Sequence, residues 1–153
     1  MLPYNRVVWV WGFLFCGAVL SAQDLPDRRL TPGATMPVTL EQVCTIGYSR
    51  TVRNVPIEEK REVFRRYGVE YVPNTYEVDH IIPLELGGSN SIENLWPQPL
   101  RGAFNSRMKD ALENRLRWMV CDGLLTLPQA QAWIAQDWIA AYQAVFAHTR
   151  RRR

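Results

Sequence analysis

Two side chains that could share one reaction stand next to each other at Asp79 and His80, in the β-rich run YEVDHIIPL. Neighbouring residues of a strand point to opposite faces, so the carboxylate can hold a metal ion while the imidazole faces a substrate. His80 is the only histidine besides His148 near the end of the chain. An imidazole with a pKa near ~6.5 is neutral enough at pH 7 to accept a proton from water. The pair therefore predicts general-base chemistry beside a bound cation.

Further polar residues follow at spacings that could complete such a site. Gly87-Gly88 is a turn signal, after which the amide of Asn94 can reach back across the loop. Asn105 opens a helical pattern, and the dipole at a helix start favours an anion or a metal-bound phosphate. Lys109 lies one turn further along the same face, and Arg107 stands between them. We expect Arg107 and Lys109 to hold the phosphates of a substrate.

These motifs, DHIIPLELGG, then NLWP, then NSRMK, resemble those of the HNH (ββα-metal) endonucleases, in particular small exported bacterial members. The resemblance covers residues 76–110 well and the span from Cys44 to Trp138 more loosely. It implies an α+β fold with a ββα-metal core, in which a hairpin and a helix are flanked by further helices. The implied activity is hydrolysis of phosphodiester bonds with little sequence specificity, with DNA as the expected nucleic-acid substrate and RNA as the alternative.

The resemblance also implies a role for each site residue. His80 is similar to the general base, Asp79 and Asn105 to metal ligands, and Asn94 to the residue that fixes the loop and orients His80. Many relatives place a histidine ligand nine residues after the middle asparagine, where this sequence has Ala103, so the role is assigned to Asn105. Oxygen ligands favour Mg²⁺ or Mn²⁺ as the single divalent cation. That cation would stabilise the charge that develops on the leaving oxygen.

The first 22 residues have the pattern of a secretory signal peptide. A short polar start with Arg6 precedes the apolar run from Val7 to Leu20, and the small residues Ser21 and Ala22 follow. Fourteen apolar residues are too few to span ~30 Å of hydrocarbon, which takes about 20. We expect export to the periplasm or medium, with no stable membrane association after cleavage; an uncleaved anchor is the alternative.

Removing this segment leaves two cysteines, Cys44 and Cys121, in an oxidising compartment, which predicts a disulfide. Two cysteines and two histidines, one of them in the tail, cannot build a four-ligand structural zinc site.

The remaining chain is long enough for one domain. We expect an extended lead-in over 23–40, the nuclease domain over 41–147 and a basic tail over 148–153. Helix signals run from Pro56 to Gly68, from Phe104 to Asp122, and from Thr126 to Val145 in one last helix. The β-rich run lies between the first two, within 71–86. Four tryptophans are expected in the core: Trp96, Trp118, Trp133 and Trp138.

Bulk charge gives no support for nucleic-acid binding, because 17 basic residues face 15 acidic ones once residues 1–22 are removed. A local basic cluster comprises Arg50, Arg53, Lys60, Arg61, Arg65 and Arg66. Solvated helix faces explain such a cluster as readily as a DNA track does. Two other functions stay open: a nucleic-acid-binding module without turnover, and a structural protein of the cell envelope.

Overall fold

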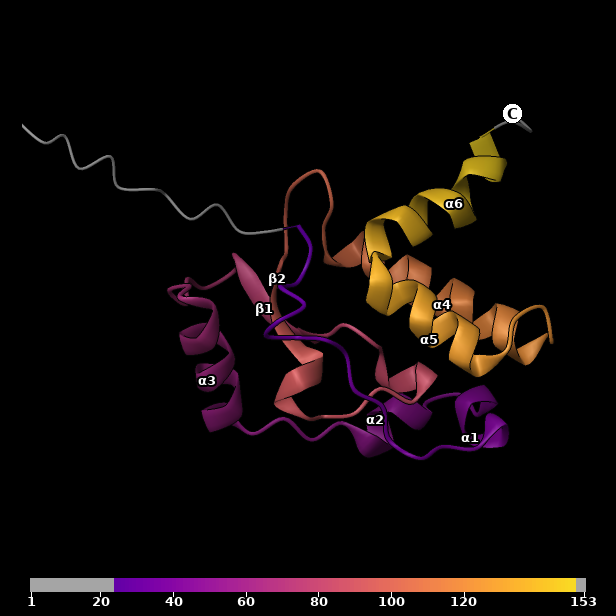
Figure 1. The fold of residues 1–153 in the computed structure, drawn as a ribbon, viewed down its shortest axis with the longest axis horizontal. Helices are drawn as coiled ribbons and strands as arrows, with labels where there is room; N and C mark the ends of the chain where they lie inside the picture. Colours follow the sequence, from indigo (N-terminus) through magenta and orange to yellow (C-terminus); the bar gives the residue numbers. More distant parts are fainter. Residues whose placement is uncertain (1–23, 151–153) are drawn as a thin grey trace, which may run out of the picture.

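The computed structural model describes the backbone of residues 24–150 and the side chains of residues 24–147, so the expected signal peptide lies outside it. The fold is α+β, as predicted: a two-stranded antiparallel hairpin with helices around it (Figure 1). The strands are β1 (Tyr76–His80) and β2 (Leu95–Pro99), and their register pairs Asp79 with Trp96 and His80 with Leu95.

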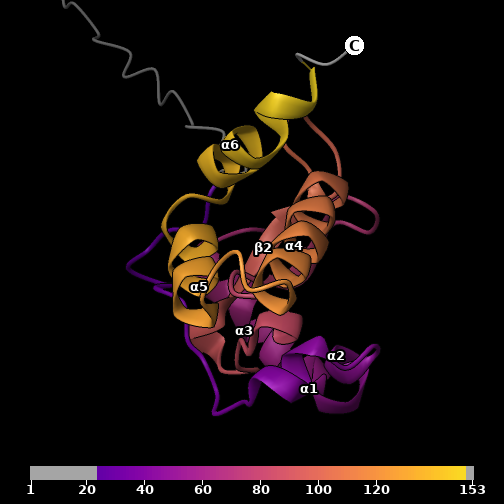
Figure 2. The ribbon, with the colours of Figure 1, turned by 90° about the vertical axis from the view of Figure 1, so that its right-hand side faces the viewer.

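Six α-helices and two short 3₁₀ helices surround this hairpin within the described residues. They are α1 (Leu40–Cys44), α2 (Tyr48–Val52), α3 (Ile57–Tyr67), α4 (Ser106–Cys121), α5 (Leu127–Gln136) and α6 (Trp138–Arg150), with η1 (Leu84–Leu86) and η2 (Ile92–Asn94) between the strands. Helix α3 lies on one side of the hairpin and α4 to α6 lie on the other (Figure 1). From the side, α4 and α5 run next to each other (Figure 2). No helix of residues 24–150 has a segment long and apolar enough to cross a bilayer.

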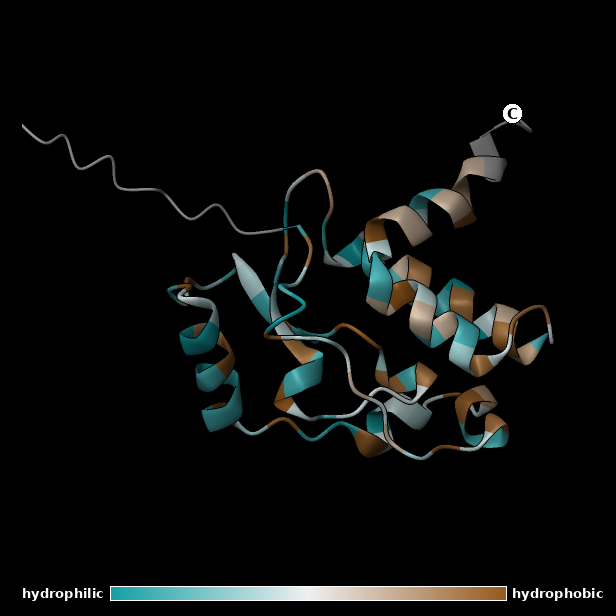
Figure 3. Ribbon diagram, viewed as in Figure 1, coloured by the Kyte–Doolittle hydropathy of each residue, from teal (hydrophilic) through white to brown (hydrophobic). Residues whose placement is uncertain are grey.

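Helix α3 begins and ends where its sequence signals predict. Pro56 precedes it, and Gly68 ends it in the left-handed region at φ 61°, which a glycine adopts without strain. Val63 and Phe64 are buried, and most of the outer surface of α3 is hydrophilic (Figure 3), although Ile57 is 60 % exposed. Helix α4 also confirms its prediction, and it begins directly after Asn105, whose side chain caps it.

The single helix predicted from Thr126 to Val145 is wrong, because the structure contains two. Helix α5 ends at Gln136 and α6 begins at Trp138. Asp137 between them is extended, with φ −162° and ψ 95°, and its Oδ1 accepts from the backbone N–H of Ala140 at 2.9 Å. This residue caps α6, and a residue that caps one helix in an extended conformation cannot continue another.

The β-structure is shorter than the predicted run and includes a strand that the pattern did not identify. β1 covers only 76–80 of the run over 71–86. Its partner β2 is LWPQP, in which Pro97 and Pro99 lack the N–H of a strand residue. Proline is tolerated in a two-stranded ladder because both strands are edges.

The hydrophobic core lies between the hairpin and helices α4, α5 and α6. Its buried members include Ile81, Trp96, Leu112, Leu116, Ile134, Trp138 and Ala141. Trp133 packs against this cluster. Trp118 is an exception to the prediction, because it is 43 % exposed and stacks under the guanidinium of Arg115 at 4.1 Å. The apolar face of α4 therefore excludes Trp118, although its type predicts burial.

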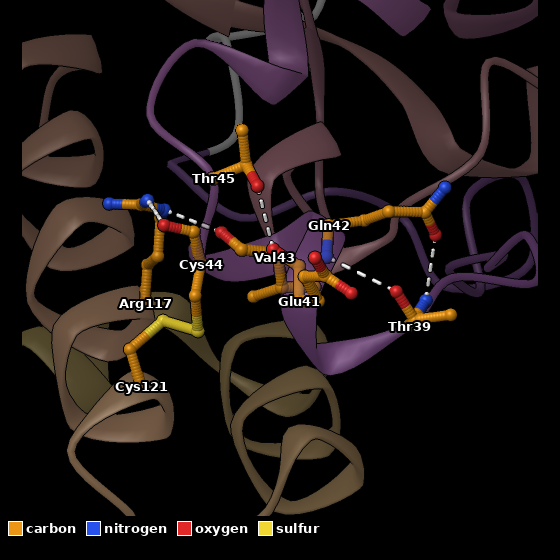
Figure 4. The surroundings of a disulfide bond; sticks show 8 residues. All are labelled: Thr39, Glu41, Gln42, Val43, Cys44, Thr45, Arg117 and Cys121. Atoms are coloured by element: carbon orange, nitrogen blue, oxygen red, sulfur yellow. Dashed lines mark hydrogen bonds between the residues drawn. A yellow bond between two sulfur atoms is a disulfide. The ribbon is translucent and has the colours of Figure 1, made fainter.

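The predicted disulfide joins Cys44, at the end of α1, to Cys121, at the end of α4 (Figure 4). The two Cα atoms are 5.7 Å apart. Arg117 strengthens the same junction, because its Nε and Nη2 each donate to a backbone carbonyl of α1, those of Val43 and Cys44, at 2.8 Å. The bridge and the arginine fix α1 and α2 beside α4.

Replacing both cysteines by serine is expected to lower the free energy of unfolding by about 2–5 kcal/mol. The bridge closes a sequence separation of 77 residues, so its loss frees a long loop in the unfolded chain. Chemical denaturation of the oxidised protein and of the serine variant, with and without reductant, measures the effect. Mass spectrometry of unreduced tryptic peptides should show the linked pair; two free thiols would contradict both the bridge and the predicted export.

Candidate active site

Asn94 fixes the loop that joins β1 to β2, as predicted. Its side chain is fully buried, and its Oδ1 accepts from the backbone N–H groups of Ile82 at 3.0 Å and Ala34 at 3.4 Å. Its Nδ2 donates to the carbonyls of Ile82 and Ser89, both at 2.9 Å. The amide thus uses both donors and both lone pairs of its oxygen inside the loop. None of these bonds reaches the imidazole of His80, so Asn94 acts on His80 only through the backbone.

Close packing, and not only the turn, requires glycine at both positions of the Gly87-Gly88 pair. A Cβ on Gly88 would lie 1.8 Å from the carbonyl oxygen of Ile82 and 2.9 Å from the Asn94 amide nitrogen. Gly87 has φ +75°, and a Cβ there would lie 2.4 Å from Val38. Only glycine allows the loop to close around Asn94 in this way.

His80 is held by Asn90, a residue that the sequence analysis did not single out. The imidazole is 1 % exposed, and its Nε2 lies 3.1 Å from Oδ1 of Asn90. The Nδ2 of Asn90 donates to the carbonyl of Val52 at 2.8 Å, which turns its oxygen toward the ring. Nε2 therefore carries the proton and Nδ1 the lone pair. The orienting role predicted for Asn94 thus belongs, for the side chain, to Asn90.

The free nitrogen of His80 suits a base. Nδ1 is buried and has no hydrogen-bond partner within the described structure. Burial lowers the pKa of His80. The charge of Asp79 acts to raise it, but the effect of burial is the larger one. The ring is therefore neutral at pH 7, and its Nδ1 can take a proton from a water molecule.

Lys109 occupies a different place from the one expected. It is fully buried, and its Nζ donates to Asp79 Oδ2 at 2.7 Å, to the carbonyl of His80 at 2.7 Å and to Glu113. All three ammonium hydrogens are used, so none is left for the phosphate contact that the sequence predicted. Burial alone would lower the pKa of Lys109, but the charges of Asp79 and Glu113 outweigh it and raise that pKa. Lys109 stays charged and keeps Asp79 in place at the end of β1.

A small pocket of about 40 Å³ brings these groups together. Its lining residues are Ser49, Arg53, Asp79, His80, Pro83, Leu84, Glu85 and Glu113. Burial raises the pKa of both Glu85 and Glu113. Oε1 of Glu85 is buried and has no partner in the described structure. The lining of the pocket thus includes the imidazole-bearing His80 and three residues with carboxyl groups, Asp79, Glu85 and Glu113.

Asn105 and Arg107 line a second, open pocket of about 560 Å³ at the start of α4, together with Arg101 and Ser106. Asn105 Oδ1 accepts from the N–H of Met108 at 3.4 Å, and its Nδ2 donates to the carbonyl of Gly102 at 3.2 Å. The structure therefore brings Asp79, His80 and Lys109 together but does not place Asn105 in their pocket. The metal contact of Asn105 and the phosphate contact of Arg107, which is exposed, stay predictions.

The oxygen donors of the small pocket suit a hard cation better than zinc. Among the side chains that the structure describes, those of residues 24–147, no three from His, Cys, Asp or Glu gather as a metal site. Mg²⁺ needs fewer protein ligands, because it keeps several waters and is held by one or two carboxylates and the phosphates of the substrate. Asp79 fits this use: Lys109 takes only its Oδ2, and its side chain is 19 % exposed. The unpartnered oxygen of Glu85 adds a second donor of the same kind.

No protein-family model, curated protein or solved structure matches this chain. An activity must therefore be inferred from the motif and from the geometry of the site.

Replacing Asn105 by alanine is expected to lower the free energy of unfolding by about 1 kcal/mol, because its side chain caps α4. Asn105→Asp keeps the cap and serves as the matched control. If the amide also binds the cation, the alanine variant loses cleavage as well, and the aspartate variant retains cation binding. Melting temperature and cleavage rate, measured together, separate the two roles: a lower melting temperature with wild-type cleavage would leave Asn105 a cap only.

Proposed function

We propose that this protein is a metal-dependent endonuclease of the ββα-metal type, which hydrolyses phosphodiester bonds of DNA with little sequence specificity. The observation that carries the proposal is His80, whose buried Nδ1 has no hydrogen-bond partner in the described structure and which lines the same small pocket as Asp79. The order β1, β2, α4 supports it, since the residues of the HNH-like motif fall on a hairpin followed by a helix.

In this proposal His80 activates the attacking water. Its Nδ1 takes the proton while Asn90 holds the protonated Nε2, so the ring keeps one orientation through the transfer. The charge of Asp79 then stabilises the imidazolium. A phosphodiester carries a negative charge, which the exposed cations that line the two pockets could hold: Arg101 and Arg107 in the larger pocket and Arg53 in the smaller one.

A divalent cation, Mg²⁺ or Mn²⁺, would supply charge stabilisation at the leaving oxygen. Asp79 would hold it, and Glu85, which lines the same pocket, would offer a second oxygen; the contact predicted for Asn105 lies outside this pocket. Lys109 favours this role, because its ammonium donates to Oδ2 of Asp79 and holds the carboxylate in one orientation.

The setting of the enzyme follows from the same features. The predicted signal peptide and the Cys44–Cys121 disulfide both favour an exported protein in the periplasm or medium. There its partner would be nucleic acid, with DNA as the expected substrate.

Digestion of plasmid DNA and of circular single-stranded DNA by the purified chain without residues 1–22 tests the proposal. The reaction is run with Mg²⁺, Mn²⁺, Zn²⁺ or EDTA. Nicked and linear products with Mg²⁺ or Mn²⁺, but none with EDTA, are the expected result. Binding of DNA without cleavage in any metal would instead indicate a binding module, and neither binding nor cleavage would favour a structural protein.

A further inference from the structure

A groove between α3 and β1 opens beside the candidate active site. Its volume is about 760 Å³, within the range of about 300–1,000 Å³ typical of small-molecule sites. Its lining residues are Arg53, Ile57, Lys60, Arg61, Phe64, Tyr71, Tyr76, Glu77 and Val78. Arg53 lines both this groove and the small pocket that contains His80. A ligand in the groove would therefore lie next to the proposed reaction centre.

Three aromatic rings form part of the groove wall. Phe64 is buried in α3 and makes edge contacts with Tyr71 at a centroid distance of 5.3 Å and with Tyr76 at 6.4 Å. Tyr71 is nevertheless 61 % exposed, an unusual state for a large ring. A ring that is ordered by a buried neighbour and open to solvent loses little entropy when a base stacks on it.

The basic cluster of the sequence divides into paired and unpaired members around this groove. Arg65 binds Glu62, and Arg66 donates to the carbonyl of Leu30. Neither lines the groove. Of the groove cations, Arg61 binds Glu58, whereas Arg53 and Lys60 form no salt bridge within the described part of the chain. Two free cations thus stand at the groove, and one of them also borders the catalytic pocket.

The aromatic rings of the groove suit a base, and Arg53 and Lys60 suit the phosphate backbone.

We propose that the groove between α3 and β1 binds an unstacked nucleobase of single-stranded nucleic acid, with the adjoining phosphates on Arg53 and Lys60. A base inside a duplex is stacked on both faces and cannot use the exposed ring of Tyr71. The proposal rests on the proposed nuclease function and names its preferred substrate: single strands, with the cleaved bond next to the bound base.

Binding is measured by fluorescence anisotropy in EDTA, with a labelled 20-nucleotide single strand and the duplex of the same sequence. Tyr71→Ala is expected to weaken single-strand binding by about 5- to 150-fold, the value of one base–aromatic stack, and to leave duplex binding within about twofold. Tyr71→Phe keeps the ring and should keep the affinity. Lys60→Ala should reduce the slope of log affinity against log salt by about 0.7, whereas Arg65→Ala, on the same helix but paired with Glu62, should not.

Equal losses for single strand and duplex, or no loss with Tyr71→Ala, would overturn the proposal. Melting temperatures of the Tyr71 variants show whether each is folded. Because binding is measured without metal, the two proposals can fail separately. Tyr71-dependent binding without cleavage under any metal would reject the nuclease and keep the groove, and cleavage without Tyr71-dependent binding would do the reverse.

Discussion

His80→Ala is expected to reduce the rate of metal-dependent DNA cleavage by about 10²- to 10⁴-fold, the usual contribution of a general base. The buried Nδ1 of His80 is the group placed to accept the proton of the attacking water, and the variant removes it. Cleavage of plasmid DNA under single-turnover conditions gives the rate. Cation affinity, measured by calorimetry, should change little, since Asp79 remains.

A test of His80 as the base needs a variant that removes the basic nitrogen and still folds. His80→Gln offers a more conservative variant, because a glutamine amide can still donate to Asn90 but cannot act as a base. His148→Ala replaces the other histidine and is expected to cleave at the wild-type rate. Wild-type turnover in a folded His80→Gln variant would rule out His80 as the base.

Lys109→Met is expected to lower the free energy of unfolding by about 3–5 kcal/mol, the cost of breaking a buried ion pair on one side. The ammonium of Lys109 is fully buried and binds Asp79, Glu113 and a backbone carbonyl. Lys109 opposes the effect of burial, which already raises the pKa of Glu113, so without the ammonium the folded-state pKa of Glu113 rises further above the unfolded one. The loss of stability should therefore be larger at pH 8 than at pH 5, where Glu113 can bind a proton.

Arg107→Met, on the same helix but exposed, is the matched control, and it should change stability by less than about 0.5 kcal/mol. Lys109→Met combined with Glu113→Leu should recover part of the loss, because an apolar pair replaces a broken ion pair. Chemical denaturation at both pH values measures all three variants. A change no larger than that of Arg107→Met would mean that the buried ammonium does not hold this site together.

The sequence by itself determined the features that depend on local signals. The helix between Pro56 and Gly68 and the helix that Asn105 begins follow from caps and from apolar spacing, which act within a few residues. The motif around Asp79 and His80 also marked the end of the strand where the pocket lies. The role expected for Asn94, to fix the loop, came from the resemblance of its motif to that of the HNH endonucleases.

Contacts between distant segments decided the rest. Asn90 orients His80 only because α2 brings the carbonyl of Val52 to its amide, 38 residues away in sequence. Lys109 has the sequence signature of an exposed, phosphate-binding lysine, yet the packing of α4 against β1 buries it completely. The second strand, β2, contains two prolines, which oppose strand formation. It forms because it pairs with β1 along its length. In each case the side chain's environment is set by another element of the fold, which the pattern of its own segment does not describe.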